Sequence, residues 1–378
     1  MTAPLTMRRA AAEGVIDFGI GQPSLSLLPV ADLRVASDHF LAQGNPVPLQ
    51  YGADHGEAPF RRTLSEFLSR HYTLPVASDE LMVTAGASQA LDLICTRFTK
   101  AGDTIFVEEP TYFLALLVFR DHGLNVIGIP IDENGMRMDA LELALTQHHP
   151  VLLYTIPTFQ NPSAVTLSAE RRARLLALSQ QHDFLIVADE VYHLLDFETA
   201  SPPPAPLASH ANTGRVLSLG SFSKICAPGL RLGWIQSAPE HLDTITASGL
   251  VQSGGGLNPF TSGVMRSLIE LGLADSGLEA FRRVYRNRSE VLSNLLREHL
   301  PAVSFTQPHG GFFIWAQLPD GRDVASVKTA AEQHGVNFQA GSRFGAADSL
   351  SQFVRLSFAH YDDAQLEEGV RRLAKAVN

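Results

Sequence analysis

Lys224 and Arg231 lie in one short segment with Ser221 and Ser223, directly after residues 216–219, whose apolar character indicates a β-strand. A lysine attacks a carbonyl carbon only as a neutral amine, and a fixed cation nearby lowers its pKa toward that state. Serine hydroxyls and a forked guanidinium together can bind a phosphate group. The segment therefore indicates an amine nucleophile beside an anion site, although a lysine after a strand is more often a solvated surface residue.

A second phosphate site is indicated where residues 83–89 lead from an expected strand into an expected helix over residues 90–98. The first amides of a helix are free and lie at the positive end of its dipole, which favours an anion. The residues in this position are Ala87, Ser88 and Gln89. The turn is neither a Walker loop nor a dinucleotide-binding fingerprint, because the required Gly and Lys spacings are absent.

Three further polar or aromatic residues follow apolar runs that indicate strands. Asp189 comes directly after residues 184–188, and a carboxylate there is costly unless it meets a cation or a donor, or caps the next helix. Tyr112 follows an expected strand, where its ring could stack on a flat ligand or pack in the core. Asn161 follows another, where it could be only a turn former.

Two segments near the chain ends have features of a carboxylate site. Residues 353–358 alternate as a strand does and contain Arg355, which is either an exposed ion-pair partner or a forked binder of an α-carboxylate. Residues 16–23 contain Gly21 and a second glycine, which let backbone approach a ligand closely, or form an ordinary loop.

The composition limits the kinds of partner. The chain has 378 residues, 45% of them hydrophobic, which is enough for two domains with a large core. Its net charge is -10 without a basic block, which argues against nucleic acid or a membrane as a partner. Two cysteines and the absence of a signal peptide or long apolar run indicate a cytoplasmic protein. The histidines lack the spacing of a zinc site, so we expect no metal.

The elements that position these residues alternate between expected strands and helices along the chain. This alternation predicts an α/β fold with a mainly parallel sheet. A long helix is expected over residues 278–299. Residues 254–256 are three glycines, and this turn either reaches the site of a partner subunit or is a simple connection.

Residues 221–224 (Ser-Phe-Ser-Lys) and 227–234 (Ala-Pro-Gly-Leu-Arg-Leu-Gly-Trp) closely resemble the cofactor-lysine segment of class I/II aminotransferases, the fold type I pyridoxal phosphate (PLP) enzymes. Residues 49–52, 189–192 and 308–315 resemble further landmarks of this family, in the expected order. The resemblance extends from Gly21 to Arg355. It implies that Lys224 binds PLP covalently and acts as the catalytic residue.

The resemblance also implies roles for the other residues. Those expected at the phosphate are Ala87, Ser88, Gln89, Ser221, Ser223, Arg231 and, from the neighbouring subunit, Tyr51. Those expected at the ring are Tyr112 stacked above it, Asp189 at the pyridine nitrogen, and Asn161 and Tyr192 at the phenolic oxygen. Those expected at the substrate carboxylate are Gly21, Asn161 and Arg355.

The family fold implies a large PLP-binding domain with a mainly parallel mixed sheet, a small α/β domain and a homodimer. The expected bounds are 1–45 for an N-terminal arm and part of the small domain, 46–275 for the large domain and 276–378 for the small domain. The sequence departs from the family at Ala164, where glycine is usual, and at Ala340, where a turn normally begins with proline.

The implied function is transfer of an amino group from an α-amino acid to a 2-oxo acid. A lyase, cyclase or oxidase acting on an amino acid would use the same cofactor residues and is the first alternative. The second is a ligand-sensing aminotransferase-like domain of a transcription regulator. That alternative requires a fused DNA-binding module, and we expect no room for one before Gly21.

Overall fold

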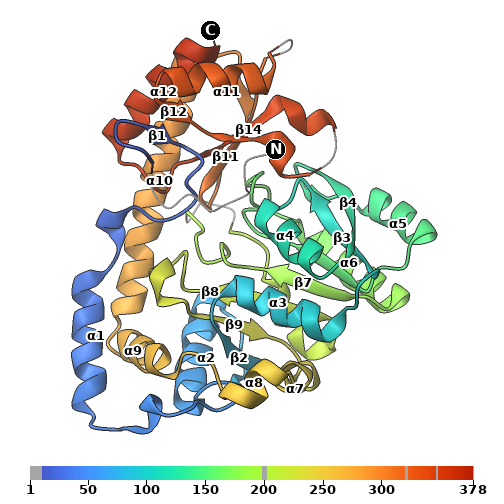
Figure 1. Cartoon of the computed structure of the whole chain (residues 1–378), viewed down its shortest axis with the longest axis vertical. Coiled ribbons are helices and arrows are strands. Elements are labelled where there is room, and N and C mark those ends of the chain that lie inside the picture. The colour runs from blue at the N-terminus through green and yellow to red at the C-terminus, as the bar shows by residue number, and fades with distance from the viewer. Residues whose placement is uncertain (1–10, 198–201, 320–321, 346–347, 378) are drawn as a thin grey trace.

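The computed structural model describes residues 11–197, 202–319, 322–345 and 348–377. Residues 1–10, at the start of the expected N-terminal arm, therefore lie outside the described residues. Figure 1 shows two parts, a larger one around a central sheet and a smaller one formed by both ends of the chain.

A mixed sheet of eight strands forms the centre of the larger part (Figure 1). From edge to edge the strands are β2 (Leu81–Thr84), β9 (Gly233–Gln236), β8 (Val216–Ser221), β7 (Leu185–Asp189), β6 (Leu152–Thr155), β3 (Thr104–Glu109), β4 (Asn125–Asp132) and β5 (Gly135–Met136). The five strands from β8 to β4 are parallel, whereas β9 and β5 pair antiparallel with their neighbours. This confirms the expected α/β fold with a mainly parallel sheet.

Side chains of the central strands are buried on both faces of this sheet. Successive residues of a strand point to opposite faces. Leu153 and Ile186 accordingly belong to one hydrophobic cluster, together with residues of α5 and α6. Tyr154 and Val187 belong to the other, with residues of α3 and α4. Burial on both faces explains why these strands read as continuous apolar runs in the sequence.

Helices cover both faces and surround the sheet. They are α2 (Ala58–Tyr72), α3 (Ala87–Phe98), α4 (Phe113–Asp121), α5 (Met138–Gln147), α6 (Ala169–His182), α7 (Pro239–Thr246), α8 (Gly249–Gly254) and α9 (Pro259–Glu270). At the start of α6 the Ser168 side chain accepts a hydrogen bond from the Arg171 amide (3.3 Å), as expected of an N-cap serine.

The smaller part combines both ends of the chain. Its antiparallel sheet has the order β10 (Ser304–Phe305), β11 (Phe313–Gln317), β14 (Phe353–Ser357) and β13 (Gln339–Ala340). The strand β1 (Ile16–Asp17) pairs with β12 (Val336–Asn337), and α11 (Val324–Gln333) and α12 (Asp363–Val377) pack nearby (Figure 1). The β1–β12 pair holds the segment that contains Gly21 against the C-terminal part of the chain.

Two long helices run along the outside of the molecule. The helix α1 (Val30–Ala42) packs on α9, where Phe40 meets Phe260 edge-on with ring centroids 5.5 Å apart. The helix α10 (Leu273–His299) connects the two parts (Figure 1). It begins before the expected residue 278 because the helix accommodates Gly277, which local propensity alone would disfavour.

Candidate active site

Four of the predicted site residues follow the carboxyl ends of neighbouring parallel strands. Tyr112 follows β3, Asn161 follows β6, Asp189 ends β7 and Lys224 follows β8. Because these strands are parallel, their carboxyl ends lie at one edge of the sheet. Ligands of open α/β sheets bind at this edge.

The amine of Lys224 lies among backbone and aromatic groups. Its Nζ donates a hydrogen bond to the carbonyl of Gly21 (3.0 Å) and lies 5.3 Å from the ring centre of Phe312. Burial, then the charge of Arg355 and then that of Arg231 together lower the pKa of Lys224 to about 8, and the charge of Asp189 opposes them. From the sequence we expected an effect of Arg231; burial and Arg355, which comes from a distant strand, have larger effects. The neutral, nucleophilic amine is thus accessible near neutral pH.

The Asp189 carboxylate is 7% exposed, and only one of its two oxygens accepts a hydrogen bond from a side chain. Its Oδ2 accepts a hydrogen bond from Tyr154 Oη (2.7 Å), whereas Oδ1 has no hydrogen-bond partner among the described residues. Burial raises the pKa of Asp189 to about 6, although the hydrogen bond from Tyr154, then that from the backbone of Val191 and then the charge of Lys224 oppose this rise. A buried acceptor without a partner indicates a site for a donor or a cation.

Arg355 on β14 reaches across from the smaller part to the edge of the large sheet. Its Nη1 donates to Asn161 Oδ1 (2.8 Å) and its Nη2 to the carbonyl of Gly19 (2.9 Å). The guanidinium lies 4.0 Å from the ring centre of Phe313. Burial lowers its pKa to about 10. A Cβ at Gly21 would lie 2.9 Å from the Phe313 ring, so only glycine fits beside this arginine.

Aromatic hydroxyls complete the site. Burial and then the charge of Asp189 raise the pKa of Tyr112 to about 12, although the charge of Arg355 opposes this rise. Tyr192 is 3% exposed, burial raises its pKa, and its side chain hydrogen-bonds that of Asn161. The ring of Tyr192 also lies 5.8 Å from Lys224 Nζ. These contacts bring Tyr112, Asn161, Asp189, Tyr192 and Lys224 together.

The predicted anion site lies at the N-terminus of α3. Gly86 precedes the helix with φ +97°, and a Cβ there would lie 3.1 Å from Arg231 Nη2, so the glycine lets the guanidinium approach the helix. Arg231 Nη2 donates to the carbonyl of Ala85 (3.1 Å). The free amides of Ala87 and Ser88 thus lie beside a forked cation, which is a suitable environment for a phosphate.

The other residues predicted at the anion site have more specific surroundings. The Gln89 side chain accepts a hydrogen bond from the amide of Ala85 (2.9 Å), so its backbone amide rather than its side chain is available to a ligand. Ser221 Oγ accepts from the amide of Ser223 (3.1 Å) and donates to the carbonyl of Leu232 (3.4 Å). The two serines are therefore fixed in one turn.

Tyr51 is also predicted to bind the phosphate, but it lies apart from the other residues of the anion site, with 83% of its surface exposed. The next residue, Gly52, forms an isolated antiparallel bridge with Gly256. The glycine turn that we could not interpret from the sequence therefore supports the loop of Tyr51. Within a single chain the Tyr51 side chain is available to a neighbouring molecule.

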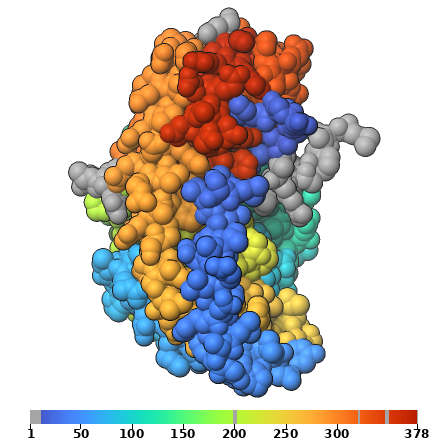
Figure 2. Space-filling model, turned by 90° about the vertical axis from the view of Figure 1, so that its left-hand side faces the viewer, coloured from blue at the N-terminus to red at the C-terminus, as the bar shows by residue number. Residues whose placement is uncertain are grey.

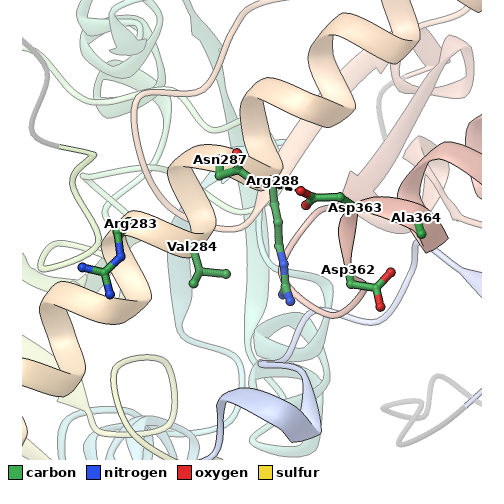
Figure 3. A pocket seen from close by; sticks show the side chains of 7 residues that line it. All are labelled: Arg283, Val284, Asn287, Arg288, Asp362, Asp363 and Ala364. Carbon is green, nitrogen blue, oxygen red and sulfur yellow. Dashed lines mark hydrogen bonds between the residues drawn. The ribbon is translucent and has the colours of Figure 1, made fainter.

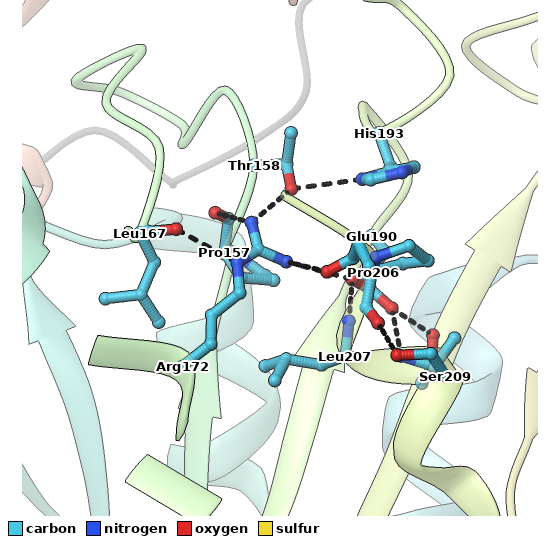
Figure 4. A network of polar contacts seen from close by, with 12 residues as sticks. Pro157, Thr158, Leu167, Arg172, Glu190, His193, Pro206, Leu207 and Ser209 are labelled. Carbon is cyan, nitrogen blue, oxygen red and sulfur yellow. Dashed lines mark hydrogen bonds and ion pairs between the residues drawn. The ribbon is translucent and has the colours of Figure 1, made fainter. Parts of the chain in front are cut away.

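A buried ion pair, which the sequence did not reveal, connects the strands that carry the site (Figure 4). Arg172 on α6 donates to the carbonyl of Pro157 (2.7 Å) and to Thr158 Oγ1 (2.8 Å), and lies 3.9 Å from Glu190 Oε1. Glu190 Oε2 accepts from Ser218 Oγ (2.8 Å). Burial lowers the pKa of Arg172 and raises that of Glu190. The network links β6, β7 and β8 directly beneath the site.

A second buried carboxylate holds the loop of Asn161. Glu108 at the end of β3 is 2% exposed and accepts hydrogen bonds from Thr155 Oγ1 (2.8 Å), the amide of Ile156 (3.0 Å) and Gln160 Nε2 (3.3 Å). Burial raises its pKa to about 7. This carboxylate fixes the residue that precedes Asn161.

The two departures from the family pattern have different structural consequences. Ala340 has φ -71°, the value that proline requires, so the missing proline leaves this turn unchanged. Ala164 has φ +61°, in the left-handed region where an alanine side chain is disfavoured and glycine is not. The loop after Asn161 thus keeps a glycine-like backbone with an alanine in it.

Replacing Ala164 by glycine should therefore raise the free energy of unfolding, by about 0.5–1 kcal/mol, because the left-handed conformation no longer opposes a Cβ. Denaturant unfolding of the purified protein measures this change. Ala177→Gly, at an exposed position within α6, is the matched control and should lower the free energy by about 1 kcal/mol. Destabilisation by both substitutions would contradict this account of Ala164.

A pocket of about 620 Å³ lies elsewhere (Figure 3). It is open and lies between α10 and the start of α12. Asn287 Nδ2 donates to Asp363 Oδ2 (2.9 Å) at its wall, and Arg288 donates to the carbonyl of Ala359 (2.8 Å). None of the predicted site residues lines it.

Cys95 and Cys226 are buried and unpaired. The described part of the chain contains no group of three or more His, Cys, Asp or Glu residues that could hold a metal ion. Within the same ranges, no helix has the length and apolar character that crossing a membrane requires.

Comparisons with known proteins match nearly the whole chain. The sequence model described as aminotransferase class I and II matches residues 13–373. Aromatic-amino-acid aminotransferase 1 of Thermococcus litoralis is 35% identical over 371 residues, which are 96% of this chain and 88% of that protein. The 2-aminoadipate transaminase of Thermus thermophilus is 34% identical over 370 residues, 96% of this chain and 90% of that protein. The crystal structure of a multiple substrate aminotransferase from Thermococcus profundus superposes with a TM-score of 0.90 at 33% identity, covering 97% of this chain and 92% of that one.

Proposed function

Because the chain belongs to the class I and II aminotransferase family and is a PLP-dependent aminotransferase, we propose that Lys224 is the residue that carries the cofactor. One observation above all supports this assignment. The amine of Lys224, with its pKa lowered to about 8, lies among Arg355, Arg231 and a buried carboxylate, Asp189, that has one oxygen without a partner. The proposed product is a 2-oxo acid, formed as the amino group passes to a second 2-oxo acid.

The residues present fit the cofactor. Asp189 Oδ1 is a buried acceptor suited to a protonated pyridine nitrogen. The start of α3 and Arg231 form a cradle suited to its phosphate. The groups proposed to hold the phosphate are Ala87, Ser88, Gln89, Ser221, Ser223 and Arg231. Those proposed around the ring are Tyr112, Asn161, Asp189 and Tyr192.

The chemistry that PLP supplies is an aldehyde that accepts the amino nitrogen and a ring that delocalises the electrons of the broken Cα–H bond. The Nζ of Lys224 takes the proton from Cα as a general base. Asp189 holds a proton at the ring nitrogen. Arg355, together with Asn161 and the backbone of Gly21, orients the substrate carboxylate by its forked donors.

The surroundings of Arg355 support a preference for amino acids with large, apolar or aromatic side chains. Its guanidinium lies over Phe313, at 4.0 Å, and near Phe344, at 5.2 Å from the ring centre. Phe113 packs edge-on against Phe344 with centroids 5.2 Å apart. Two relatives are named for aromatic amino acids and for 2-aminoadipate, which is consistent with a substrate that has a long side chain lying near these aromatic rings.

A screen of amino donors tests this function. Tyrosine, phenylalanine, 2-aminoadipate, alanine and aspartate are each incubated with the holoenzyme and 2-oxoglutarate, and keto acid, glutamate and ammonia are measured. We expect keto acid and glutamate in equal amounts without ammonia, with aromatic donors fastest. Tyramine, which lacks the carboxylate that Arg355 would bind, should react at least about 100-fold more slowly. Ammonia release would instead support the lyase or oxidase alternative.

We also propose that the protein is a homodimer. Several large apolar side chains are exposed on one stretch of chain along the outside: Leu25, Val30, Val35, Leu41, Val47 and Leu49. Figure 2 shows this blue segment running down one face beside α10. An exposed apolar surface of this kind is typical of an interface. This apolar stretch is continuous in sequence with Tyr51. In the proposed dimer, Tyr51 would reach the cofactor phosphate bound by the partner subunit.

Sedimentation equilibrium should give twice the 41.0 kDa chain mass. Leu49→Glu, which places a charge in the proposed interface, should weaken the dimer by about tenfold or more in its dissociation constant. The control is Leu143→Glu, on α5, where the native side chain is 62% exposed and lies away from this stretch. A monomer at micromolar concentration would refute the proposed dimer.

Two coarser proposals remain. The unpaired, buried state of both cysteines supports a reducing, cytoplasmic location, which subcellular fractionation can test.

We propose domain bounds of 1–45 and 276–378 for the arm and small domain, and 46–275 for the large domain. The β1–β12 pair supports joining the two chain ends, and limited proteolysis with mass spectrometry tests the bounds.

A further inference from the structure

The hydroxyl of Tyr154 is the one side-chain donor that the described structure places on the Asp189 carboxylate, and nothing in the sequence motifs involves it. Tyr154 lies on β6 opposite Val187 of β7, two residues before Asp189. Both side chains point to the same sheet face, because residues two apart in a strand share a face. The 2.7 Å hydrogen bond is therefore fixed by the register of two central strands.

Both groups of this pair are deeply buried. Tyr154 is 1% exposed and Asp189 is 7% exposed. Burial raises the pKa of the Tyr154 phenol well above its ordinary value, so the hydroxyl keeps its proton and acts only as a donor toward Asp189. The hydrogen bond occupies Oδ2 and leaves Oδ1, which has no partner among the described residues, for another group.

We propose that Tyr154 is a positioning residue, which directs Asp189 Oδ1 toward the ring nitrogen of the cofactor and keeps the shared proton on that nitrogen. This inference rests on the proposed role of Asp189. A single proton lies between two competing bases, the carboxylate and the ring nitrogen. A donor on Oδ2 stabilises the ionised carboxylate and makes it the weaker base of the two.

Burial gives this competition its importance. It raises the pKa of Asp189 to about 6, which makes the carboxylate a stronger base than an exposed one. Without Tyr154 the proton would move toward Asp189, and the ring would lose its positive charge. The other ionisable groups that face Asp189 remain in place in the variant: Glu190, the next residue in the chain, and Lys224, Tyr112 and Tyr192.

The test uses holoenzyme loaded with PLP labelled with ¹⁵N in the ring. In Tyr154→Phe the ¹⁵N resonance should move toward that of neutral pyridine, and kcat should fall about tenfold with KM unchanged, as expected for one lost hydrogen bond to a charged group. The affinity of the cofactor-free protein for PLP should also fall about tenfold. The matched control is Tyr285→Phe, because Tyr285 is equally buried and its hydroxyl has no hydrogen-bond partner among the described residues.

A second measurement does not depend on the folding of that variant. Replacing Tyr154 alone by 3-fluorotyrosine keeps the shape and gives a stronger donor, so the ¹⁵N resonance should move further toward that of protonated pyridine. Unchanged resonances in both proteins would overturn the role of Tyr154. If wild-type protein bound no PLP and gave no transamination, the proposed function would fail instead, so the two failures are distinguishable.

Discussion

Replacing Lys224 by alanine should lower kcat/KM for transamination by at least about 10⁴-fold. A single proton-transfer group contributes up to about 10⁴-fold, and this variant loses a second function as well. The variant loses both the amine that would bind the cofactor and the base that would take the Cα proton. PLP should still bind at the cradle formed by Arg231 and the start of α3, because that site does not involve Lys224. Steady-state kinetics and the visible spectrum measure both effects.

Borohydride reduction separates the covalent link from simple binding. In the wild-type protein it should attach the cofactor irreversibly to the peptide that contains Lys224, as detected by mass spectrometry. Lys100→Ala, at an exposed position after α3, is the matched control and should behave as wild type. Full turnover by the Lys224 variant, or label on another lysine, would remove the basis of the proposed site.

The second large effect is expected for Asp189→Asn, which keeps the shape of the side chain and removes its charge. The variant can no longer hold a protonated ring nitrogen, so kcat should fall by about 10²- to 10⁴-fold, as for loss of one partner of a buried charge pair. Substrate binding should change little, since the substitution leaves the proposed carboxylate site at Arg355 intact. Steady-state kinetics with a saturating aromatic donor measure this loss.

Stability should change in the opposite direction to activity. Because burial raises the pKa of Asp189 above its unfolded value, ionised Asp189 disfavours the folded, cofactor-free protein once the pH exceeds about 6. The cofactor-free Asn variant should therefore be at least as stable as wild type at pH 8, and the difference should disappear below about pH 4. Asp183→Asn, whose carboxylate is 88% exposed and pairs with Arg215 (2.7 Å), is the control; it should leave activity unchanged and alter stability by less than about 1 kcal/mol. A less stable Asn variant at pH 8 would contradict the unfavourable burial of this carboxylate.

Much of the fold and the chemistry could be predicted from the sequence. The alternation of apolar runs and helical segments gave the mainly parallel sheet, since strands buried on both faces have a clear sequence pattern. Lys224, Asp189 and Asn161 could be named as candidates because each follows such a run directly or within a few residues, and their expected roles came from the resemblance of the surrounding motifs to the family. The roles of these residues remain predictions, which the variants above test.

The supporting residues could not be predicted, for a physical reason. Tyr154 and Arg172 look like ordinary members of a strand and a helix, and their partners are on other elements. Only the register between β6 and β7 brings Tyr154 to Asp189, and a slip of one residue would turn it to the opposite face. The lowering of the Lys224 pKa by Arg355 is likewise a contact between distant segments.

The hydrogen bonds that the carbonyls of Gly19 and Gly21 accept also have a consequence for folding during translation. Lys224 reaches Gly21 over a separation of 203 residues, and Arg355 reaches Gly19 over 336. Contacts between residues so far apart in sequence form late in folding, because closing the long loop costs chain entropy before the contact itself contributes any stabilisation. During translation the site therefore stays incomplete until the strand that bears Arg355 leaves the ribosome, so a chain that ends before this strand would lack the arginine that we propose binds the substrate carboxylate.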